Sequence, residues 1–506
     1  MQTKTDPDAI QPFLSDASYM KEGWAERVVF PETAEEVGDV LREATRNKIP
    51  VTVSGAGTGT VGGRVPLSGI LLATDKLDKI KGIKREGESG SVTAESGVRL
   101  VDLQQFVDAE GLLYPPDPTE RSCFLGGTVA TNASGSRTFK YGPTRNYVRR
   151  LQVALATGDL IDVRRGETRA DANGRIEVQL PSGRVLQVQL PTYEMPRTRK
   201  HASGYYVAPN MDLIDLFIGS EGTLGVVTEV EVALLPKPKG VLSGIVFFES
   251  EEKLLLFVHQ ARTLSLQNRQ LLGVETGAGI DARALEFFDN ESLNFLRQKY
   301  EAIPKTSVGA VFFEQETSPD TEDGLLTAWL ELFEEHSALT DTSWFATNEQ
   351  DQAKLREFRH ALPVLMNEWF ARHRQRKVST DMSVPDDSFA GMLRFYQDSL
   401  RPTGLRYTIF GHIGDNHVHV NILPRDDDEA AKAREIYLRL VKRAVEVGGT
   451  ISAEHGIGKL KREYLKLLYS EQHLQEMAAL KRAFDPACIL GRGNIFDESY
   501  LGDTDH

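Results

Sequence analysis

The stretch VTVSGAGTGTVGG (Val51–Gly63) places a loop with five glycines directly after a short run that is typical of a β-strand. The loop does not match the dinucleotide-binding turn of a Rossmann fold, because that turn opens straight into a helix. Here the chain continues with GGRVPLSGILLA, in which Pro66 and Gly69 disfavour a helix. A P-loop is excluded as well, since the chain has no GK[ST] after the glycines. Two interpretations stay open: a nest of backbone N–H groups around a pyrophosphate, or a glycine-rich β-turn.

Two further loops have the same small-residue character. PPDPTERSCFLGGTVATNASG (Pro115–Gly135) combines rigid prolines, a glycine pair and several hydroxyl or amide side chains, and GSEGTLGVVTEV (Gly219–Val230) is similar. Such stretches can run close along an extended ligand and donate many hydrogen bonds to it. They favour the ligand-binding interpretation of the first loop.

Composition limits the class of protein. A chain of 506 residues, 40% hydrophobic and 26% charged, is globular and too long for one hydrophobic core. A formal charge of −14 argues against nucleic acid as a partner. Only two cysteines, Cys123 and Cys488, are present, which excludes a cysteine-ligated iron–sulfur cluster built within this chain. The N-terminus lacks a secretory pattern and no apolar stretch approaches the ~20 residues that span a bilayer, so we expect a cytoplasmic protein, with peripheral contact to the inner membrane left open.

Strand and helix patterns predict a mixed α+β protein. Residues 1–30 read as a loosely structured start, and Pro31–Lys48 has helical spacing of its apolar residues. Alternation in residues 160–190 predicts a polar β-hairpin. Prolines mark a boundary near Pro238, beyond which strand-like and helix-like stretches alternate, as expected for helices packed on a sheet. An amphipathic helix over DEAAKAREIYLRLVKRAVEV should end at Gly448-Gly449.

Three of the eleven histidines lie in GHIGDNHVHVN (Gly411–Asn421). The pattern predicts two strands around a two-residue turn at Asp415-Asn416, so that His412 and His419 lie opposite each other with Cβ atoms roughly 5 Å apart. Two such imidazoles can share a metal ion, and Glu454 in SAEHGIG could complete the site. The residues alone favour the other interpretation, strand histidines hydrogen-bonded to carboxylates, because no HExxH-like spacing supports a metal.

Taken together, these motifs resemble those of FAD-binding oxidoreductases of the vanillyl-alcohol-oxidase superfamily. Within it, the chain is most similar to the branch of D-lactate dehydrogenases, D-2-hydroxyglutarate dehydrogenases and glycolate oxidase flavin subunits, from about residue 25 to 497. The resemblance implies an α+β fold: a two-subdomain FAD-binding domain of the PCMH type, an α+β substrate cap domain with an antiparallel sheet, and a helical C-terminal segment. The expected parts are an N-terminal extension (1–25), the FAD-binding domain (26–238), the cap domain (239–440) and a C-terminal segment that returns to the flavin site (441–506).

The resemblance also implies how FAD is bound. Family members with covalent flavin carry a histidine in the first loop; none is present here, so the FAD should be held non-covalently. The cofactor-binding residues implied are Ser54, Gly55, Ala56, Gly57, Thr58, Gly59, Pro116, Asp117, Ser122, Gly127, Thr131, Asn132, Gly135, Glu221, Gly222 and Val226.

A divalent metal, zinc or manganese, and a catalytic set are implied by the same resemblance. The family motifs GHxGDGNxH and SxEHGxG match His412, His419 and Glu454 as metal ligands. The expected catalytic residues are His455 as general base, Arg359 as the cation for the substrate carboxylate, Lys377 as a second cation, and Asn421 as a polar substrate contact. Without the resemblance, Arg359 would read as a helix-surface charge.

Two departures from the family pattern stand out. GDNHVH replaces the usual GDGNLH, so His417 is either an additional substrate or metal-shell group or a surface strand residue, and the second interpretation is favoured slightly. The usual C-terminal NPGK is replaced in FDPACILGRGNIF, so the contacts of Gly491–Asn494 are not assigned.

The implied activity is oxidation of a 2-hydroxy acid, D-lactate or a related D-2-hydroxy acid, to the 2-oxo acid by hydride transfer to FAD N5. With no second redox centre in the chain, electrons should pass to a quinone, a cytochrome, an electron-transfer flavoprotein or an iron–sulfur subunit; a homodimer is compatible with the pattern. One rival is a transferase resembling alkylglycerone-phosphate synthases, which share the FAD loops and TDMSVP but lack the EHG element. The other is a non-catalytic FAD-binding electron-transfer subunit, which would be expected to lose the metal ligands.

Overall fold

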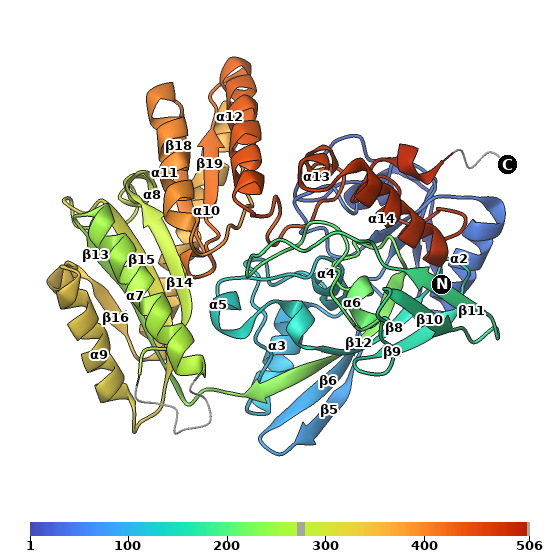
Figure 1. Cartoon of the computed structure of the whole chain (residues 1–506), viewed down its shortest axis with the longest axis horizontal. Helices are drawn as coiled ribbons and strands as arrows, with labels where there is room; N and C mark the ends of the chain where they lie inside the picture. The colour runs from blue at the N-terminus through green and yellow to red at the C-terminus, as the bar shows by residue number, and fades with distance from the viewer. Residues whose placement is uncertain (271–278, 503–506) are drawn as a thin grey trace.

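The computed structural model describes residues 1–270 and 279–502 of the chain. These residues form a four-stranded, a six-stranded and a seven-stranded sheet, together with a separate two-stranded hairpin. In Figure 1 the first two sheets lie with the C-terminal helices on one side of the molecule, and the seven-stranded sheet lies with its helices on the other. None of the helices in the described ranges is long and apolar enough to span a membrane.

The first sheet has the strand order β1-β2-β4-β3, with β2, β4 and β3 mutually parallel. Its strands are β1 (Gln2–Lys4), β2 (Arg27–Phe30), β4 (Ile70–Ala73) and β3 (Val51–Ser54). The predicted helix is present as α2 (Ala34–Asn47), begun by Thr33, whose hydroxyl accepts from the Glu36 N–H. The expectation of a loose start was wrong, because β1 pairs with β2 and Ile10 and Leu14 pack against the sheet.

The second sheet is antiparallel, in the order β5-β6-β12-β8-β9, with β7 beside β12. Its strands are β5 (Ile80–Glu86), β6 (Ser89–Glu95), β7 (Leu112–Leu113), β8 (Val148–Ala154), β9 (Leu160–Arg164) and β12 (Val226–Pro236), and the short helices α3 (Leu100–Ala109), α4 (Leu125–Ala130), α5 (Thr138–Tyr141) and α6 (Ile214–Phe217) lie in its connections. The predicted hairpin is confirmed as β10 (Arg175–Gln179) and β11 (Val185–Gln189), joined across Ser182-Gly183.

The third sheet has the order β16-β13-β15-β14-β18-β19-β17 and is antiparallel throughout. Its strands are β13 (Gly240–Phe248), β14 (Ala282–Asp289), β15 (Gly309–Thr317), β16 (Trp344–Ala346), β17 (Val378–Ser379), β18 (Arg406–Gly411) and β19 (His419–Leu423). Strands buried on both faces read as continuous apolar runs rather than alternating ones. In β13, Val246 and Phe248 face one core while Ile245 and Phe247 face the other.

Helices cover both faces of the third sheet (Figure 1). The helices α7 (Glu251–Gln270) and α9 (Glu322–Glu335) pack on one face, through residues such as Phe257 and Trp329. On the other face lie α8 (Asn290–Leu296) and the long α10 (Glu349–His373), which contributes Phe358 and Met366. The helix α12 (Asp427–Glu446) packs against β17 and against α11 (Phe389–Leu400). Because α12 continues to Glu446, the expected boundary at residue 440 falls inside this helix.

The C-terminal segment packs on the first sheet. After α13 (Arg462–Leu468) and α14 (Glu471–Phe484), the chain runs parallel to β3: the Val51 N–H donates to the Ile489 carbonyl and the Gly491 N–H donates to the Val51 carbonyl. The segment with unassigned contacts therefore reaches the glycine loop, where Asn494 Nδ2 donates to the carbonyl of Gly63 at 2.9 Å. This anchoring brings the end of the chain to the carboxyl edge of β3, where the loop begins.

Candidate active site

One cavity of about 330 Å³ joins the three small-residue loops. Its wall is built by residues 55–61, 63 and 64 after β3, by parts of the 118–134 stretch, by residues 220–222 and 225 before β12, and by Val227 in β12. Glu454 and His455, far along the chain, also face it. The carboxyl edge of a parallel sheet is where ligands bind in α/β arrangements, and the first loop leaves β3 at that edge.

The backbone of these loops fits a large planar or extended cofactor such as FAD. A Cβ built on Gly59 or on Gly127 would meet nothing within 4 Å, so both backbones border open space. Gly57 has φ +80°, and a Cβ there would clash with the Arg64 guanidinium at 2.5 Å. As predicted, the loop does not open into a helix; the next element is β4. The glycines thus leave the space that a cofactor would occupy.

Arg64, which the sequence did not single out, holds the first loop in place and also lines the cavity. Its Nη1 donates to the Gly55 carbonyl at 2.8 Å and to Ser54 Oγ at 3.2 Å, while Nε reaches the Ser15 carbonyl. Burial lowers the pKa of Arg64, against the influence of Asp16 and Asp75. An isolated arginine that follows a glycine-rich loop belongs to no motif, so the sequence did not indicate that Arg64 holds the loop.

Part of the implied cofactor set lines the cavity directly. The wall includes Gly55, Ala56, Gly57, Thr58, Gly59, Gly127, Thr131, Glu221 and Gly222. Residues that the sequence analysis did not select also line it, among them Thr119, Glu120, Phe124, Ser134 and Ser220. From the sequence of a loop alone, it cannot be predicted which of its small residues face the cavity and which face away, because that depends on the path of the backbone.

The rest of the implied set lies outside this wall and holds the loops together. These contacts are Ser54 Oγ with Arg64, the Pro116 carbonyl with Gln104 Nε2, Asp117 with Arg137, Ser122 with Glu120, Asn132 Oδ1 with the Arg145 N–H, Gly135 against the Asp117 carbonyl, and Val226 in the core beside α2. These contacts hold the cavity wall in place, and binding of the cofactor by these residues stays a prediction.

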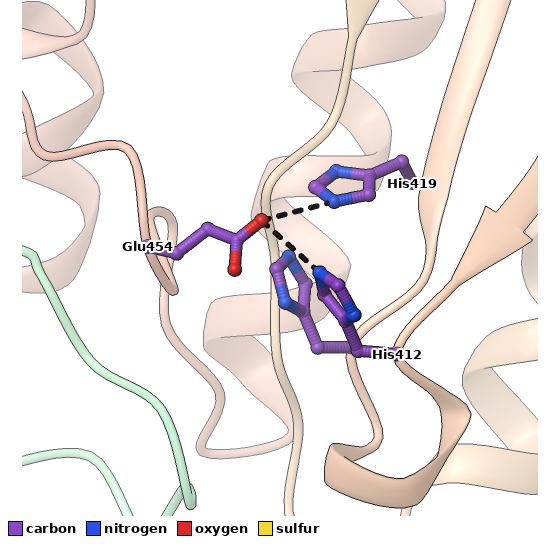
Figure 2. A group of neighbouring side chains, drawn as sticks. His412, His419 and Glu454 are labelled. Atoms are coloured by element: carbon purple, nitrogen blue, oxygen red, sulfur yellow. Dashed lines mark hydrogen bonds and ion pairs between the residues drawn. The ribbon is translucent and has the colours of Figure 1, made fainter. Parts of the chain in front are cut away.

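Glu454, His412 and His419 converge at the edge of this cavity. The Glu454 Oε1 atom lies 3.3 Å from Nε2 of His412 and 3.3 Å from Nε2 of His419. Figure 2 shows the carboxylate pointing from its loop toward the two imidazoles, which come from the opposite side. Two imidazoles and one carboxylate at this spacing fit a divalent transition metal.

The predicted two-residue turn and strand register that were to bring His412 opposite His419 were wrong. Phe410, not His412, pairs with His419, and the connection between β18 and β19 runs from residue 412 to 418 with a 3₁₀ turn at Ile413–Asp415. Tertiary packing explains the longer loop, because Ile413 is fully buried and Gly414 approaches the Phe139 ring. Asn416 adopts the left-handed conformation (φ 53°), as its side chain permits.

Glu454 is held charged by Lys200 and by Ser134 of the second small-residue loop. Lys200 Nζ lies 3.2 Å from Glu454 Oε2, and Ser134 Oγ donates to the same oxygen at 3.1 Å. Burial opposes ionisation, but Lys200 and His412 outweigh it and hold the pKa of Glu454 well below its usual range. Lys200 is fully buried and gave no motif in the sequence.

His412 has a second carboxylate behind it. Its Nδ1 lies 2.6 Å from Glu286 Oε1, and Glu286 Oε2 accepts from Arg359 Nε at 3.0 Å. Burial disfavours the imidazolium, yet Glu286 and Glu454 raise the pKa of His412 to about 9. Arg359 thus lies near the cluster with part of its guanidinium engaged by Glu286, and it is not the helix-surface charge of the alternative interpretation.

His455 faces the cavity beside the cluster. Its ring stacks on that of His419, with centroids 5.5 Å apart, and its Nδ1 lies 3.4 Å from Asp381 Oδ2. Asp381 also accepts from the His455 N–H at 3.0 Å and from Lys461 Nζ at 2.7 Å. Burial lowers the pKa of His455 to about 4, although Asp381 favours the charged form. The neutral imidazole can accept a proton.

Two further predicted residues share a face with His419. Asn421 is buried on β19, its Nδ2 donates to the His419 carbonyl at 3.4 Å, and its Oδ1 has no hydrogen-bond partner in the described structure. Ser379 on β17 pairs with Asn421, and alternation places Lys377 on that same face. Lys377 is exposed and makes no ion pair with any described residue; desolvation by nearby protein lowers its pKa, against the influence of Asp381.

His417 is not a surface strand residue, which corrects the slightly favoured interpretation. It is fully buried, and its ring centroid lies 5.3 Å from that of His412 and 4.5 Å from that of His419. Its backbone N–H donates to the His412 carbonyl, and it bridges to Ser383. The alternation of the strand-like sequence did not reveal this, because residue 417 precedes β19 and belongs to the loop.

A second acidic residue of the cavity wall fixes the His455 loop. Glu221 has φ 53° and accepts from the N–H groups of Ile457 and Gly458, each at 2.7 Å. Burial raises the pKa of Glu221 to about 7, against those two hydrogen bonds. Glu221 therefore ties the third small-residue loop (219–230) to the loop that carries Glu454 and His455, so the two sides of the cavity are fixed relative to each other.

Comparison with known proteins agrees with this arrangement. A family model for an FAD binding domain matches residues 25–164, and one for the C-terminal domain of FAD linked oxidases matches residues 274–495. The chain is 32% identical to D-lactate dehydrogenase of Anaerostipes hadrus, covering 93% of this chain and 89% of the relative. It is 29% identical to glycolate oxidase subunit GlcD of Bacillus subtilis (95% and 91% covered) and 26% identical to D-2-hydroxyglutarate dehydrogenase of Stutzerimonas stutzeri (97% and 95% covered).

Solved structures share the fold. A structure of alkyldihydroxyacetonephosphate synthase superimposes with a TM-score of 0.66 at 15% identity, covering 97% of this chain and 82% of that chain. This confirms the predicted α+β class with a PCMH-type FAD-binding fold, and at that identity it bears on the fold alone. Because both family models match, and because similarity to a relative at 32% identity extends over most of both chains, this protein belongs to the family of FAD-linked oxidases and is an FAD-dependent oxidoreductase.

Proposed function

We propose that this protein oxidises a small D-2-hydroxy acid, D-lactate or a close relative, to the corresponding 2-oxo acid and passes the electrons to an external acceptor. The observation that carries the proposal is that Glu454 and His455 line the same cavity as the glycine loops, with two imidazoles at the carboxylate. The names of relatives at 26–32% identity, D-lactate dehydrogenase, glycolate oxidase subunit GlcD and D-2-hydroxyglutarate dehydrogenase, support the substrate class.

Two groups would be held by the residues described. FAD, held by the three loops without a covalent bond, would act as the hydride acceptor. A divalent metal, zinc or manganese, held by His412, His419 and Glu454, supplies polarisation of the substrate hydroxyl. The donor set fits such an ion, because imidazole and carboxylate are its ordinary ligands.

The chain's own side chains would do the rest. Lys377, which makes no ion pair within the described ranges, and Arg359, whose planar guanidinium is only partly engaged by Glu286, would bind the substrate carboxylate. Asn421, whose Oδ1 lacks a partner among the described residues, would make a polar contact to the substrate. Neutral His455 would take the hydroxyl proton as general base.

Asp381 would keep His455 in position for that step. It holds both the His455 backbone N–H and, at 3.4 Å, the ring Nδ1. Lys461 balances the buried charge of the carboxylate, and Ser452 Oγ donates a hydrogen bond to it. An oriented base is the common arrangement at sites of proton transfer.

The reduced flavin would hand its electrons to a quinone, a cytochrome, an electron-transfer flavoprotein or an iron–sulfur subunit. Cys123 and Cys488 are both free and buried, which fits a reducing compartment such as the cytoplasm. Peripheral contact with the inner membrane and a homodimer belong to the same proposal, and the family resemblance is the reason for including both.

An anaerobic screen tests the proposal. The FAD-loaded protein is mixed with D- and L-lactate, glycolate, D-2-hydroxyglutarate and D-malate, and flavin absorbance is monitored. Bleaching by a D-2-hydroxy acid, with one 2-oxo acid formed per FAD, is expected. Flavin that stays oxidised with every acid would favour a non-catalytic electron-transfer subunit, and flavin-dependent exchange of an acyl group on a glycerone phosphate would favour a transferase. The transferase is supported by fold alone.

A further inference from the structure

His417 lies inside the cluster of potential metal ligands. One ligating atom from each of His412, His417, His419 and Glu454 can be chosen so that all four lie within 4.8 Å of one another. The His417 side chain is fully buried, so water does not compete for its nitrogens. The cluster therefore offers three imidazoles and one carboxylate to a common centre.

The protein leaves part of the His417 ring unsatisfied. Within the described residues, Nδ1 has no hydrogen-bond partner, and Nε2 lies 3.1 Å from Asp381 Oδ1. The charge of Asp381 is already balanced by Lys461 Nζ at 2.7 Å, and Ser452 Oγ donates to the same carboxylate at 2.6 Å. A buried polar atom without a partner costs roughly 1–3 kcal/mol, so its retention calls for a ligand.

We infer that His417 is a fourth protein ligand of the metal ion held by His412, His419 and Glu454. The inference rests on the proposed function, since it deepens the same site. The common family motif has asparagine at this position, so the fourth imidazole would distinguish this chain from relatives with GDGNLH.

A fourth ligand changes what the site selects. Imidazole suits zinc, iron, nickel and copper, whereas carboxylate and carbonyl oxygens suit manganese and magnesium. Three nitrogens to one oxygen should therefore favour zinc over manganese. Catalytic zinc sites commonly have three protein ligands and one open position, so a substrate hydroxyl here would need a fifth position or would displace one imidazole.

The loop geometry supports this role. The His417 N–H donates to the His412 carbonyl at 3.2 Å, and Ser383 bridges to His417 from the other side. Asn416, in the left-handed conformation, turns the chain just before it. The backbone that carries the ring is thus held in place, and the ring itself is fully buried.

Zinc competition against a chromophoric chelator tests the inference on the FAD-loaded protein, without substrate. We expect His417→Asn, which restores the common family residue, to weaken zinc binding at least tenfold and to narrow the preference for zinc over manganese. His336→Asn is the matched control: this buried histidine on the far side of the third sheet bonds Gln260, and its loss should leave zinc affinity unchanged.

X-ray absorption of the zinc-loaded wild-type protein provides a measurement that does not depend on the variant folding. Three imidazoles around zinc are expected. The inference would be overturned if the spectrum showed only two imidazoles around zinc. It would also be overturned if a flavin-replete His417→Asn protein bound zinc as tightly as wild type, or if the wild-type protein bound no divalent ion. Because no readout uses a hydroxy acid, failure of the proposed reaction is seen separately, as flavin that no acid bleaches.

Discussion

Glu286 Oε1 and His412 Nδ1 lie 2.6 Å apart, and both side chains are buried. The strand β14 thus supplies a carboxylate that fixes the ring of a candidate metal ligand in a loop more than a hundred residues further along the chain. Carboxylate–histidine–metal arrangements orient the ring and raise its basicity. The same Glu286 also holds Arg359, so one residue couples the metal cluster to the candidate carboxylate-binding cation.

Glu286→Gln should weaken divalent metal binding about 10- to 100-fold, because the neutral amide no longer orients and polarises His412. The measurement is chelator competition on the FAD-loaded protein. Glu357→Gln, on the exposed surface of α10 where it pairs with Lys299, is the control and should have no effect. Equal affinities of Glu286→Gln and wild type would assign Glu286 a purely structural role.

His455→Gln should slow flavin reduction by the substrate about 10²- to 10⁴-fold, because the side chain that takes the hydroxyl proton is lost. Anaerobic stopped-flow absorbance gives the rate. FAD and metal contents measured on the same sample should match the wild type, which separates proton transfer from cofactor loss. A variant that reduces flavin at the wild-type rate would remove His455 from the mechanism.

Lys377→Met should raise the dissociation constant of the hydroxy acid by about 10- to 100-fold, since a charge-assisted hydrogen bond contributes roughly 1.5–3 kcal/mol. Lys377→Arg keeps the charge and should lie between the two. The constant comes from the substrate dependence of the flavin-reduction rate. If Lys377→Met binds the acid as tightly as wild type, Arg359 alone serves the carboxylate.

Lys481→Met should lower the free energy of unfolding by about 3–5 kcal/mol, because it leaves the charge of the fully buried Asp485 without its cation. Lys481 Nζ also donates to the carbonyls of Thr223 and Leu490, and so holds the C-terminal segment beside the third FAD loop. Urea denaturation monitored by fluorescence measures the change. Lys442→Met, on the exposed side of α12, is the control; an equally small effect of both substitutions would contradict this account.

Asp289 should make stability depend on pH. Burial raises the pKa of this α8 cap to about 7, although Ser292 hydrogen bonds oppose the rise. The unfolded chain ionises Asp near pH 4, so between about pH 4 and 7 only the folded state keeps the proton, and stability falls with rising pH until the contribution is lost above about pH 7. Relative to Asp289→Asn, wild type should lose up to about 4 kcal/mol over that range in urea titrations. Parallel pH profiles would show that the carboxyl is already ionised when folded.

Local chemistry made much of the fold predictable. Thr33 and the apolar spacing after it gave α2, and Ser182-Gly183 gave the turn of the β10–β11 hairpin, because both depend on neighbours in sequence. The glycine loop could be separated from a Rossmann turn because Pro66 and Gly69, close behind it in the chain, disfavour the helix that such a turn opens. The start of the chain was mispredicted, since β1 gains its stability from pairing with β2 and not from its own sequence.

The site was predictable only where a motif marked it. Glu454 and His455 were found through SAEHGIG, whereas Glu286 and Lys200 sit in ordinary strand or loop sequence. Asp381 lies in TDMSVP, but that stretch did not indicate its contact with His455. The contacts that reveal the roles of these three residues join them to partners 74 to 254 residues away. The His412–His419 register failed because Ile413 is buried against another part of the molecule, which lengthens the loop. Packing between segments far apart in the chain leaves no local pattern in the sequence, so this loop length could not be predicted.

The most direct measurement is the rate of anaerobic flavin reduction by D-lactate or the best acid of the screen, before and after metal removal. We predict that the FAD-replete, metal-stripped protein is reduced at least a hundredfold more slowly and that one equivalent of zinc or manganese per chain restores the rate. Glu454→Gln, which lacks the shared carboxylate, should not be restored. A metal-stripped protein reduced as fast as the loaded one would contradict the claim that these imidazoles and this carboxylate serve a metal in the reaction.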